Sequence, residues 1–116
     1  MIFGSHYIIF STDAEADRDF FRDVLEFPFV DVGHDWLIFR APPAEVALHP
    51  SEEGVGGEFF LLTDDLVSEM TRLKEKGVSL SEITEERWGT VTNITLPSGR
   101  EIGLYQPKHA SPPRQL

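Results

Sequence analysis

The segment EIGLYQP at residues 101–107 repeats the pattern of an earlier segment, EVALHP at residues 45–50. Each begins with glutamate, continues with a branched apolar residue, a small residue and leucine, and ends on proline. A second pair of segments, HYIIFSTD at 6–13 and EFFLLTDD at 58–65, aligns without gaps. Because self-similarity at a fixed spacing marks duplicated units, the sequence predicts two copies of one module of about 50 residues.

The length of 116 residues predicts one domain, and the shares of 41% hydrophobic and 26% charged residues are those of an ordinary globular protein. We expect this domain to cover 1–110, with module 1 at about 3–50, a linker at 51–57, module 2 at about 58–107 and a tail at 108–116. A module of this size is too small to bury a core alone, so the two should pack together or against a second chain.

The formal net charge of −10 argues against nucleic acid and against anionic membrane surfaces as partners. No apolar run approaches the roughly 18 residues of a membrane-spanning helix, and the N-terminus lacks the pattern of a signal peptide. The sequence contains no cysteine, which excludes disulfides and thiolate metal sites. We therefore expect a cytoplasmic protein.

Hydrophobic periodicity and turn residues predict the order β-α-β-β-β in each module. The expected strands are 3–11, 29–32, 36–40 and 45–49 in module 1, and 58–63, 78–83, 90–96 and 100–106 in module 2. We expect the run at 8–10 to be a covered central strand, because it is apolar on both faces. The fold class is therefore α+β: two βαβββ modules form a curved mixed sheet with helices outside and a cleft between them.

Each helix carries a start signal and one apolar stripe. Thr12 and Glu15 form a capping box for the first helix, and Asp64 or Asp65 caps the second. The first stripe consists of Ala16, Phe20, Phe21, Val24 and Leu25, with Asp17, Arg18, Arg22 and Asp23 on the solvent side. The second stripe consists of Leu66, Met70 and Leu73, followed by Gly77 at the C-cap.

The chain resembles the vicinal oxygen chelate superfamily, which includes glyoxalases, bleomycin-resistance proteins and extradiol dioxygenases. The resemblance covers roughly residues 3–107 and is carried by His6 on the first strand, by DFFRDVL at 19–25 and by LPSGREIGLYQP at 96–107. It implies the glyoxalase/bleomycin resistance/dihydroxybiphenyl dioxygenase fold. It also implies a homodimer, formed by module swapping or by sheet packing.

In the metal-dependent members of this superfamily, one ion is held by one ligand from each of four strands. By the resemblance, these positions fall on His6, Ala47, Glu58 and Gly103, of which Ala47 and Gly103 have no coordinating side chain. His49 lies two residues after Ala47 on the same strand face. One hypothesis is therefore that His6, His49 and Glu58 hold one divalent Zn, Ni, Mn or Fe ion for a lyase or dioxygenase, with Glu58 as the base.

The same positions allow a site without metal, in which His6 is a neutral core histidine and Glu58 an exposed residue at a strand start. Small residues at 47 and 103 would then enlarge the cleft for a flat or bulky organic molecule, as in the sequestering antibiotic-resistance branch that the chain resembles. The candidate pocket residues are Ala47, Gly103, Tyr105, His49, Trp36, Trp88 and several phenylalanines, although aromatic side chains also serve as plain core.

Our first interpretation is a protein that binds a small organic molecule in the cleft beside a degenerate metal site. The metal-dependent lyase or dioxygenase is the alternative, and a structural or interaction domain with a filled cleft is a third. His34, in a predicted turn, and His109, in the tail, are expected to be incidental.

Overall fold

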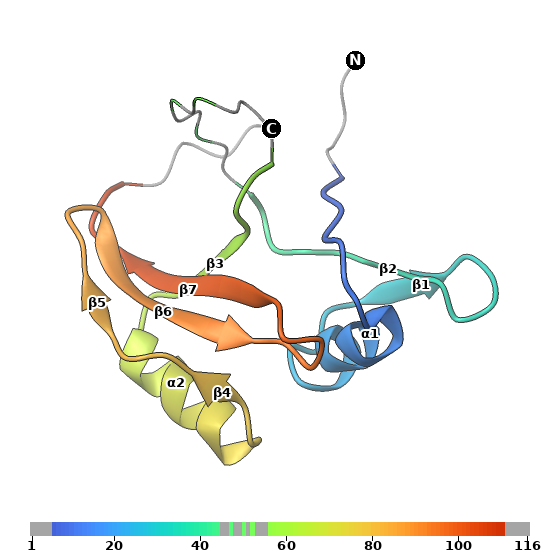
Figure 1. The fold of residues 1–116 in the computed structure, drawn as a ribbon. Coiled ribbons are helices and arrows are strands. Elements are labelled where there is room, and N and C mark those ends of the chain that lie inside the picture. The colour runs from blue at the N-terminus through green and yellow to red at the C-terminus, as the bar shows by residue number, and fades with distance from the viewer. Residues whose placement is uncertain (1–5, 45–46, 48–49, 51, 53–55, 111–116) are drawn as a thin grey trace.

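The computed structural model describes residues 6–44, 47, 50, 52 and 56–110. These residues form two helices and seven strands (Figure 1). In chain order the elements are α1 (Ala14–Asp23), β1 (Phe29–Asp31), β2 (Leu37–Phe39), β3 (Phe60–Leu62), α2 (Leu66–Glu75), β4 (Ser79–Leu80), β5 (Thr84–Glu85), β6 (Gly89–Thr95) and β7 (Glu101–Pro107).

Module 2 forms a mixed sheet with the strand order β3-β7-β6-β4, and β5 also pairs with β6. β3 runs parallel to β7, whereas β6 is antiparallel to β4, β5 and β7. Helix α2 provides the crossover that a parallel pair requires, and it lies across one face of the sheet (Figure 1). The predicted βαβββ order of this module is confirmed, with the short strand β5 as an addition.

Side chains along β6 and β7 alternate between the two faces of this sheet. Ile94 lies opposite Ile102, and Thr92 lies opposite Leu104, on the face that packs against α2. Val91 lies opposite Tyr105, and Asn93 opposite Gly103, on the other face. The helix and the sheet bury one core, consisting of Leu66, Met70 and Leu73 from α2, Phe20 from α1, and Ile94, Leu96, Ile102 and Leu104 from the sheet. Each fully buried aliphatic side chain contributes about 1.5–3 kcal/mol to folding.

The ends of α2 and the β6–β7 turn follow the local rules of the sequence. The Asp65 carboxylate accepts a hydrogen bond from the Ser68 amide and caps the helix. Gly77 has a φ of 80° and donates to the Lys74 carbonyl, which closes the C-terminus as predicted. In the turn at 97–99, the Gly99 amide donates to the Leu96 carbonyl over 2.8 Å.

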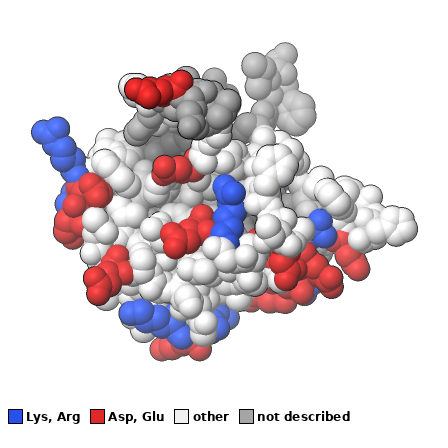
Figure 2. All heavy atoms as spheres, in the orientation of Figure 1, with Lys and Arg blue, Asp and Glu red and all other residues white. Residues whose placement is uncertain are grey.

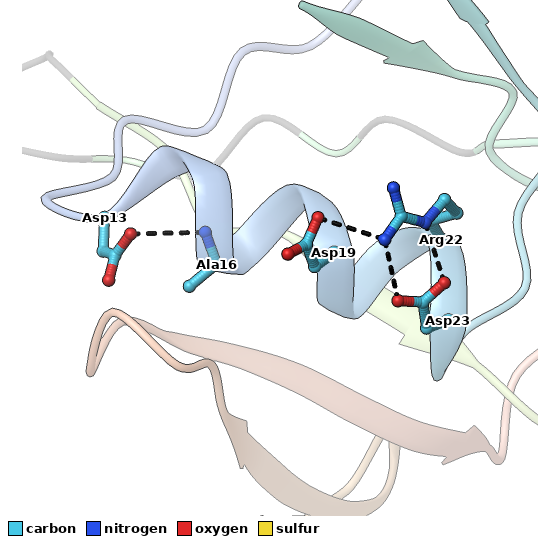
Figure 3. A network of polar contacts seen from close by, with 5 residues as sticks. All are labelled: Asp13, Ala16, Asp19, Arg22 and Asp23. Carbon is cyan, nitrogen blue, oxygen red and sulfur yellow. Dashed lines mark hydrogen bonds and ion pairs between the residues drawn. The ribbon is translucent and has the colours of Figure 1, made fainter. Parts of the chain in front are cut away.

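Helix α1 is capped by Asp13 and not by Thr12, because the Asp13 carboxylate accepts from the Ala16 amide at 3.2 Å (Figure 3). Near its other end, Arg22 contacts Asp19 and donates two hydrogen bonds to Asp23 (Figure 3). These hydrogen bonds hold the pKa of Asp23 below its usual range. All three side chains are exposed, so the network contributes little to stability.

Asp17 corrects the sequence analysis, which placed this residue on the solvent side of α1. It is only 7% exposed, and its carboxylate accepts hydrogen bonds from the Ser98 amide (3.0 Å), the Ser98 hydroxyl (2.7 Å) and the Ser11 hydroxyl (2.8 Å). Three donors offset the cost of burying the charge. Asp17 therefore ties the helix of module 1 to the β6–β7 turn of module 2.

Module 1 differs more from the prediction. β1 and β2 form a two-stranded antiparallel sheet that projects beside α1 (Figure 1). Residues 6–11 form no strand, and the expectation of a covered strand at 8–10 is wrong, because Ile8 is 63% and Phe10 81% exposed. Most of the predicted strand at 45–49 lies outside the described residues.

The hydrogen bonds of Asp17 generate a stability prediction. Replacing the buried Asp17 with Ala leaves the half-buried amide and hydroxyl of Ser98 without their acceptor, so we expect the free energy of unfolding in urea to fall by about 2–3 kcal/mol. Asp19→Ala is the matched control, because Asp19 is an exposed carboxylate of the same helix and should cost less than about 1 kcal/mol. Equal losses for the two variants would contradict the role assigned to Asp17.

Candidate functional site

Three aromatic rings meet on the sheet face opposite α2, and we call them the aromatic cluster: Phe60 on β3, Trp88 just before β6, and Tyr105 on β7. The centroids of Trp88 and Tyr105 lie 4.9 Å apart with the ring planes at 89°. Phe60 lies 5.5 Å from Tyr105 and 5.8 Å from Trp88, also edge-on. Such pairs stabilise each other by about 0.5–1.5 kcal/mol beyond their burial. The cluster is therefore a rigid platform.

The cluster is only partly covered. Tyr105 is buried and Phe60 half-buried, whereas Trp88 is 41% exposed, and the neighbouring Leu62 is 43% exposed. Large apolar side chains at the surface of a folded sheet often mark a contact site for a ligand or partner. The platform thus presents one broad indole ring and one aliphatic side chain toward solvent.

Phe60 also explains the glycine at position 103. Gly103 lies directly opposite Phe60 in the parallel β3–β7 pair, and a Cβ atom at residue 103 would overlap the Phe60 ring. The expectation that a small residue at 103 enlarges the cleft is therefore wrong, because the ring fills that space. In the metal-dependent members that the chain resembles, this strand position carries a ligand. Here it carries no donor atom and is covered by an aromatic ring, so it does not fit a metal.

Among the described residues, the other expected ligand positions are not gathered into a metal site. The Tyr7 ring stacks on Phe59 with centroids 5.8 Å apart, which places their neighbours His6 and Glu58 on adjoining segments, both exposed. Ala47 is exposed, and His49 lies outside the described residues. Within residues 6–44, 47, 50, 52 and 56–110, no group of three His, Cys, Asp or Glu side chains could hold a metal ion.

Trp36 lies apart from the aromatic cluster, in the turn between β1 and β2. It is 60% exposed, and the guanidinium carbon of Arg18 lies 4.6 Å from its ring centroid. This turn contains His34 and Asp35 in left-handed backbone conformations, with φ values of 54° and 61°. The described contacts of Trp36 therefore join the hairpin to α1 and do not add to the platform.

Two hollows flank the cluster at opposite ends of β3 and β7. One, of about 210 Å³, lies where these strands begin and is lined by Gly57, Glu58, Phe59, Phe60, Asn93, Arg100, Glu101 and Gly103. The other, of about 410 Å³, lies where they end and is lined by Leu62, Thr63, Asp64, Gln106 and Pro107. Each combines apolar with polar side chains, and both are open to solvent.

The segment after β7 is anchored against the sheet, although the sequence analysis assigned 108–116 to a tail. The Lys108 amide donates to the Trp88 carbonyl over 2.9 Å, and its ammonium contacts Glu85 at 2.7 Å and the Glu86 carbonyl at 3.1 Å. The hydrogen bond from Lys108 holds the pKa of Glu85 below its usual range. This anchor brings His109 to within 3.2 Å of the Tyr105 hydroxyl.

Charged side chains of both signs occur on the surface of the molecule. On the face drawn in Figure 2, acidic and basic side chains are scattered among uncharged ones, without a basic patch. Neither helix of the described part of the chain is long and apolar enough to cross a membrane. The described residues on that face thus offer no footprint for a phosphate backbone.

Sequence reasoning missed two residues of this site, Phe60 and His109. The signal for Phe60 was a glycine inside a strand, since such a residue marks a close approach of another group. His109 carried no local signal, because its contact with Tyr105 depends on the Lys108 anchor.

Comparisons with solved structures give a consistent fold. No family model matches the chain, and no curated protein sequence does. Solved structures do match, among them TnmS3, an antibiotic binding protein from Streptomyces sp. CB03234, with 25% identity, 93% of this chain and 99% of that chain covered, and a TM-score of 0.68.

Two further structures carry the family name. A glyoxalase/bleomycin resistance protein from Streptomyces sp. CB03234 matches with 27% identity, 83% and 93% coverage and a TM-score of 0.57. A member of the glyoxalase/bleomycin resistance protein/dioxygenase superfamily from Sphaerobacter thermophilus DSM 20745 matches with 24% identity, 90% and 98% coverage and a TM-score of 0.59. The predicted fold class is confirmed, and these structural neighbours are consistent with the resemblance of the sequence to the vicinal oxygen chelate superfamily.

Proposed function

We propose that the protein binds and sequesters a small, flat organic molecule on the aromatic cluster, without using a metal ion. The observation that carries this proposal is the Phe60 ring over Gly103. The Phe60 ring places an apolar surface over the position that the resemblance assigns to a metal ligand. The same ring packs against the indole of Trp88, which is 41% exposed. The similarity to TnmS3, an antibiotic binding protein, supports the same function.

The chemistry of the cluster defines the ligand class. An exposed indole offers a flat apolar face for stacking, and the two neighbouring rings fix its orientation. Platforms of this kind gain affinity because little side-chain freedom is lost on binding. The ligand is therefore a planar, largely apolar molecule, and polar side chains of the flanking hollows contact its substituents.

A homodimer is part of the proposal. Phe29, Val30, Val32 and Ile38 of the β1–β2 hairpin are all at least 37% exposed. A two-stranded hairpin is marginally stable alone in water, and an apolar hairpin of this kind is stabilised by covering it. We propose that a second copy of the chain covers it.

Binding to the aromatic cluster can be measured with the neutral fluorescent probe N-phenyl-1-naphthylamine. Because Trp88 supplies the exposed ring, we expect Trp88→Ala to weaken the probe affinity about tenfold. Val67→Ala is the control, since Val67 is also exposed (67%) but lies on α2, away from the cluster. Equal affinities of wild type and Trp88→Ala for the probe would contradict the proposed binding site.

The metal hypothesis is tested by elemental analysis of wild type and His6→Ala, purified without a histidine tag. We expect far less than one metal ion per chain in both proteins, and no change in melting temperature with a chelator. About one Zn, Ni, Mn or Fe per chain, lost in His6→Ala, would replace the proposed function with that of a metal-dependent enzyme.

Light scattering after gel filtration tests the dimer. We expect a mass of two chains for wild type and of one chain for Val30→Asp, because a buried unpaired carboxylate in an apolar interface is costly. Val67→Asp places the same charge on an exposed valine of α2 and should remain dimeric. A monomeric wild type would exclude the dimer while leaving binding to the cluster open to its own test.

A further inference from the structure

The hollow at the start of β3 and β7 contains a guanidinium group without a partner. Arg100 lines this hollow together with Asn93, Phe60 and Gly103. The Nε atom of Arg100 is buried and donates no hydrogen bond. The two terminal Nη atoms form no hydrogen bond or ion pair within the described part of the chain either, but they are not buried. The positive charge of Arg100 is therefore open to an acceptor from outside the chain.

Other cations of the described residues have acidic partners. Arg22, Arg72 and Lys108 each contact a carboxylate at 2.7–3.2 Å. Arg100 has no such contact, and a buried donor without an acceptor is unfavourable for folding. Groups that lower stability in this way are expected at functional sites, where a ligand supplies the missing partner.

Phe60 joins this hollow to the aromatic cluster. Its ring centroid lies 5.8 Å from that of Trp88, and Phe60 also lines the hollow beside Gly103. Arg100 precedes Gly103 by three residues, which is about 10 Å along a strand. A molecule of two fused rings on the cluster, together with the long arginine side chain, spans this distance.

We propose that Arg100 binds a carboxylate of the ligand, so that the protein selects planar aromatic acids over neutral molecules of the same shape. This inference rests on the function proposed above. The two Nη atoms form a planar fork that donates to both oxygens of one carboxylate.

The neighbouring polar side chains are compatible with a bound carboxylate. Asn93 lies on β6 opposite Gly103, and its side-chain amide, which has no hydrogen bond to the described residues, provides a further donor. Glu58 and Glu101 also line the hollow, but neither forms an ion pair with Arg100. Both are exposed, so water and salt screen their repulsion of an anion.

A pair of matched ligands tests this selectivity: 2-naphthoate, which is ionised at neutral pH, and 2-naphthamide, its uncharged analogue of the same shape. We expect titration calorimetry to show that wild type binds 2-naphthoate about tenfold more tightly, as a charge-assisted hydrogen bond implies. Arg100→Met keeps an apolar stem without the charge, so it should bind both ligands equally and 2-naphthamide as wild type does. Lys74→Met removes one charge from an exposed position on α2, on the other face of the sheet, and should keep the preference.

Melting temperatures distinguish a role in binding from a role in folding. Because Arg100→Met removes a buried donor that has no acceptor, we expect its melting temperature to equal or exceed that of wild type. A lower melting temperature together with weaker binding of both ligands would assign Arg100 to the fold and overturn the proposal.

The outcomes separate this inference from the proposed function. If 2-naphthamide binds wild type as tightly as 2-naphthoate, or if the preference persists in Arg100→Met, the role of Arg100 is wrong and binding to the cluster stands. If 2-naphthoate is preferred through Arg100 while Trp88→Ala leaves both affinities unchanged, the carboxylate site stands and the aromatic platform is wrong. If neither ligand binds wild type, both proposals are overturned.

Discussion

The pairing of β6 with β7 is the constraint on which the rest of the structure depends. Seven residue pairs fix which side chains face α2 and which face away. The core includes the side chains of Ile94, Ile102 and Leu104. Because side chains alternate along a strand, the opposite face carries Val91, Gly103 and Tyr105. A shift by one residue would exchange these two sets, which would destroy the core and the aromatic cluster together.

The parallel pairing of β3 with β7 determines the chemistry of the exposed face. It sets Phe60 against Gly103 and Leu62 beside Tyr105, so that an apolar ring covers the position at which, by the resemblance, metal-dependent proteins of that superfamily carry a ligand. One fold can support both chemistries because the site depends on a few side chains held by a common sheet.

Local sequence rules accounted for module 2 far better than for module 1. Helix α2, with its Asp65 cap, its buried Leu66, Met70 and Leu73 and its Gly77 end, follows directly from periodicity and capping. Asp17 shows the limit of such rules: helical periodicity places it toward solvent, yet three donors from Ser11 and Ser98 bury it. The two donors of Ser98 lie 81 residues from Asp17 in the sequence, so no local sequence pattern could predict them.

The sequence by itself determined the α+β class, the βαβββ order of module 2 and the resemblance to a superfamily, because these depend on hydrophobic period, turn residues and motifs that act over short distances. The tertiary structure alone decided that Phe60 covers Gly103, that Trp36 lies away from the platform and that His109 reaches Tyr105. The physical reason is that strand register and the path of the chain after β7 bring together residues far apart in sequence, and no local preference encodes those distances.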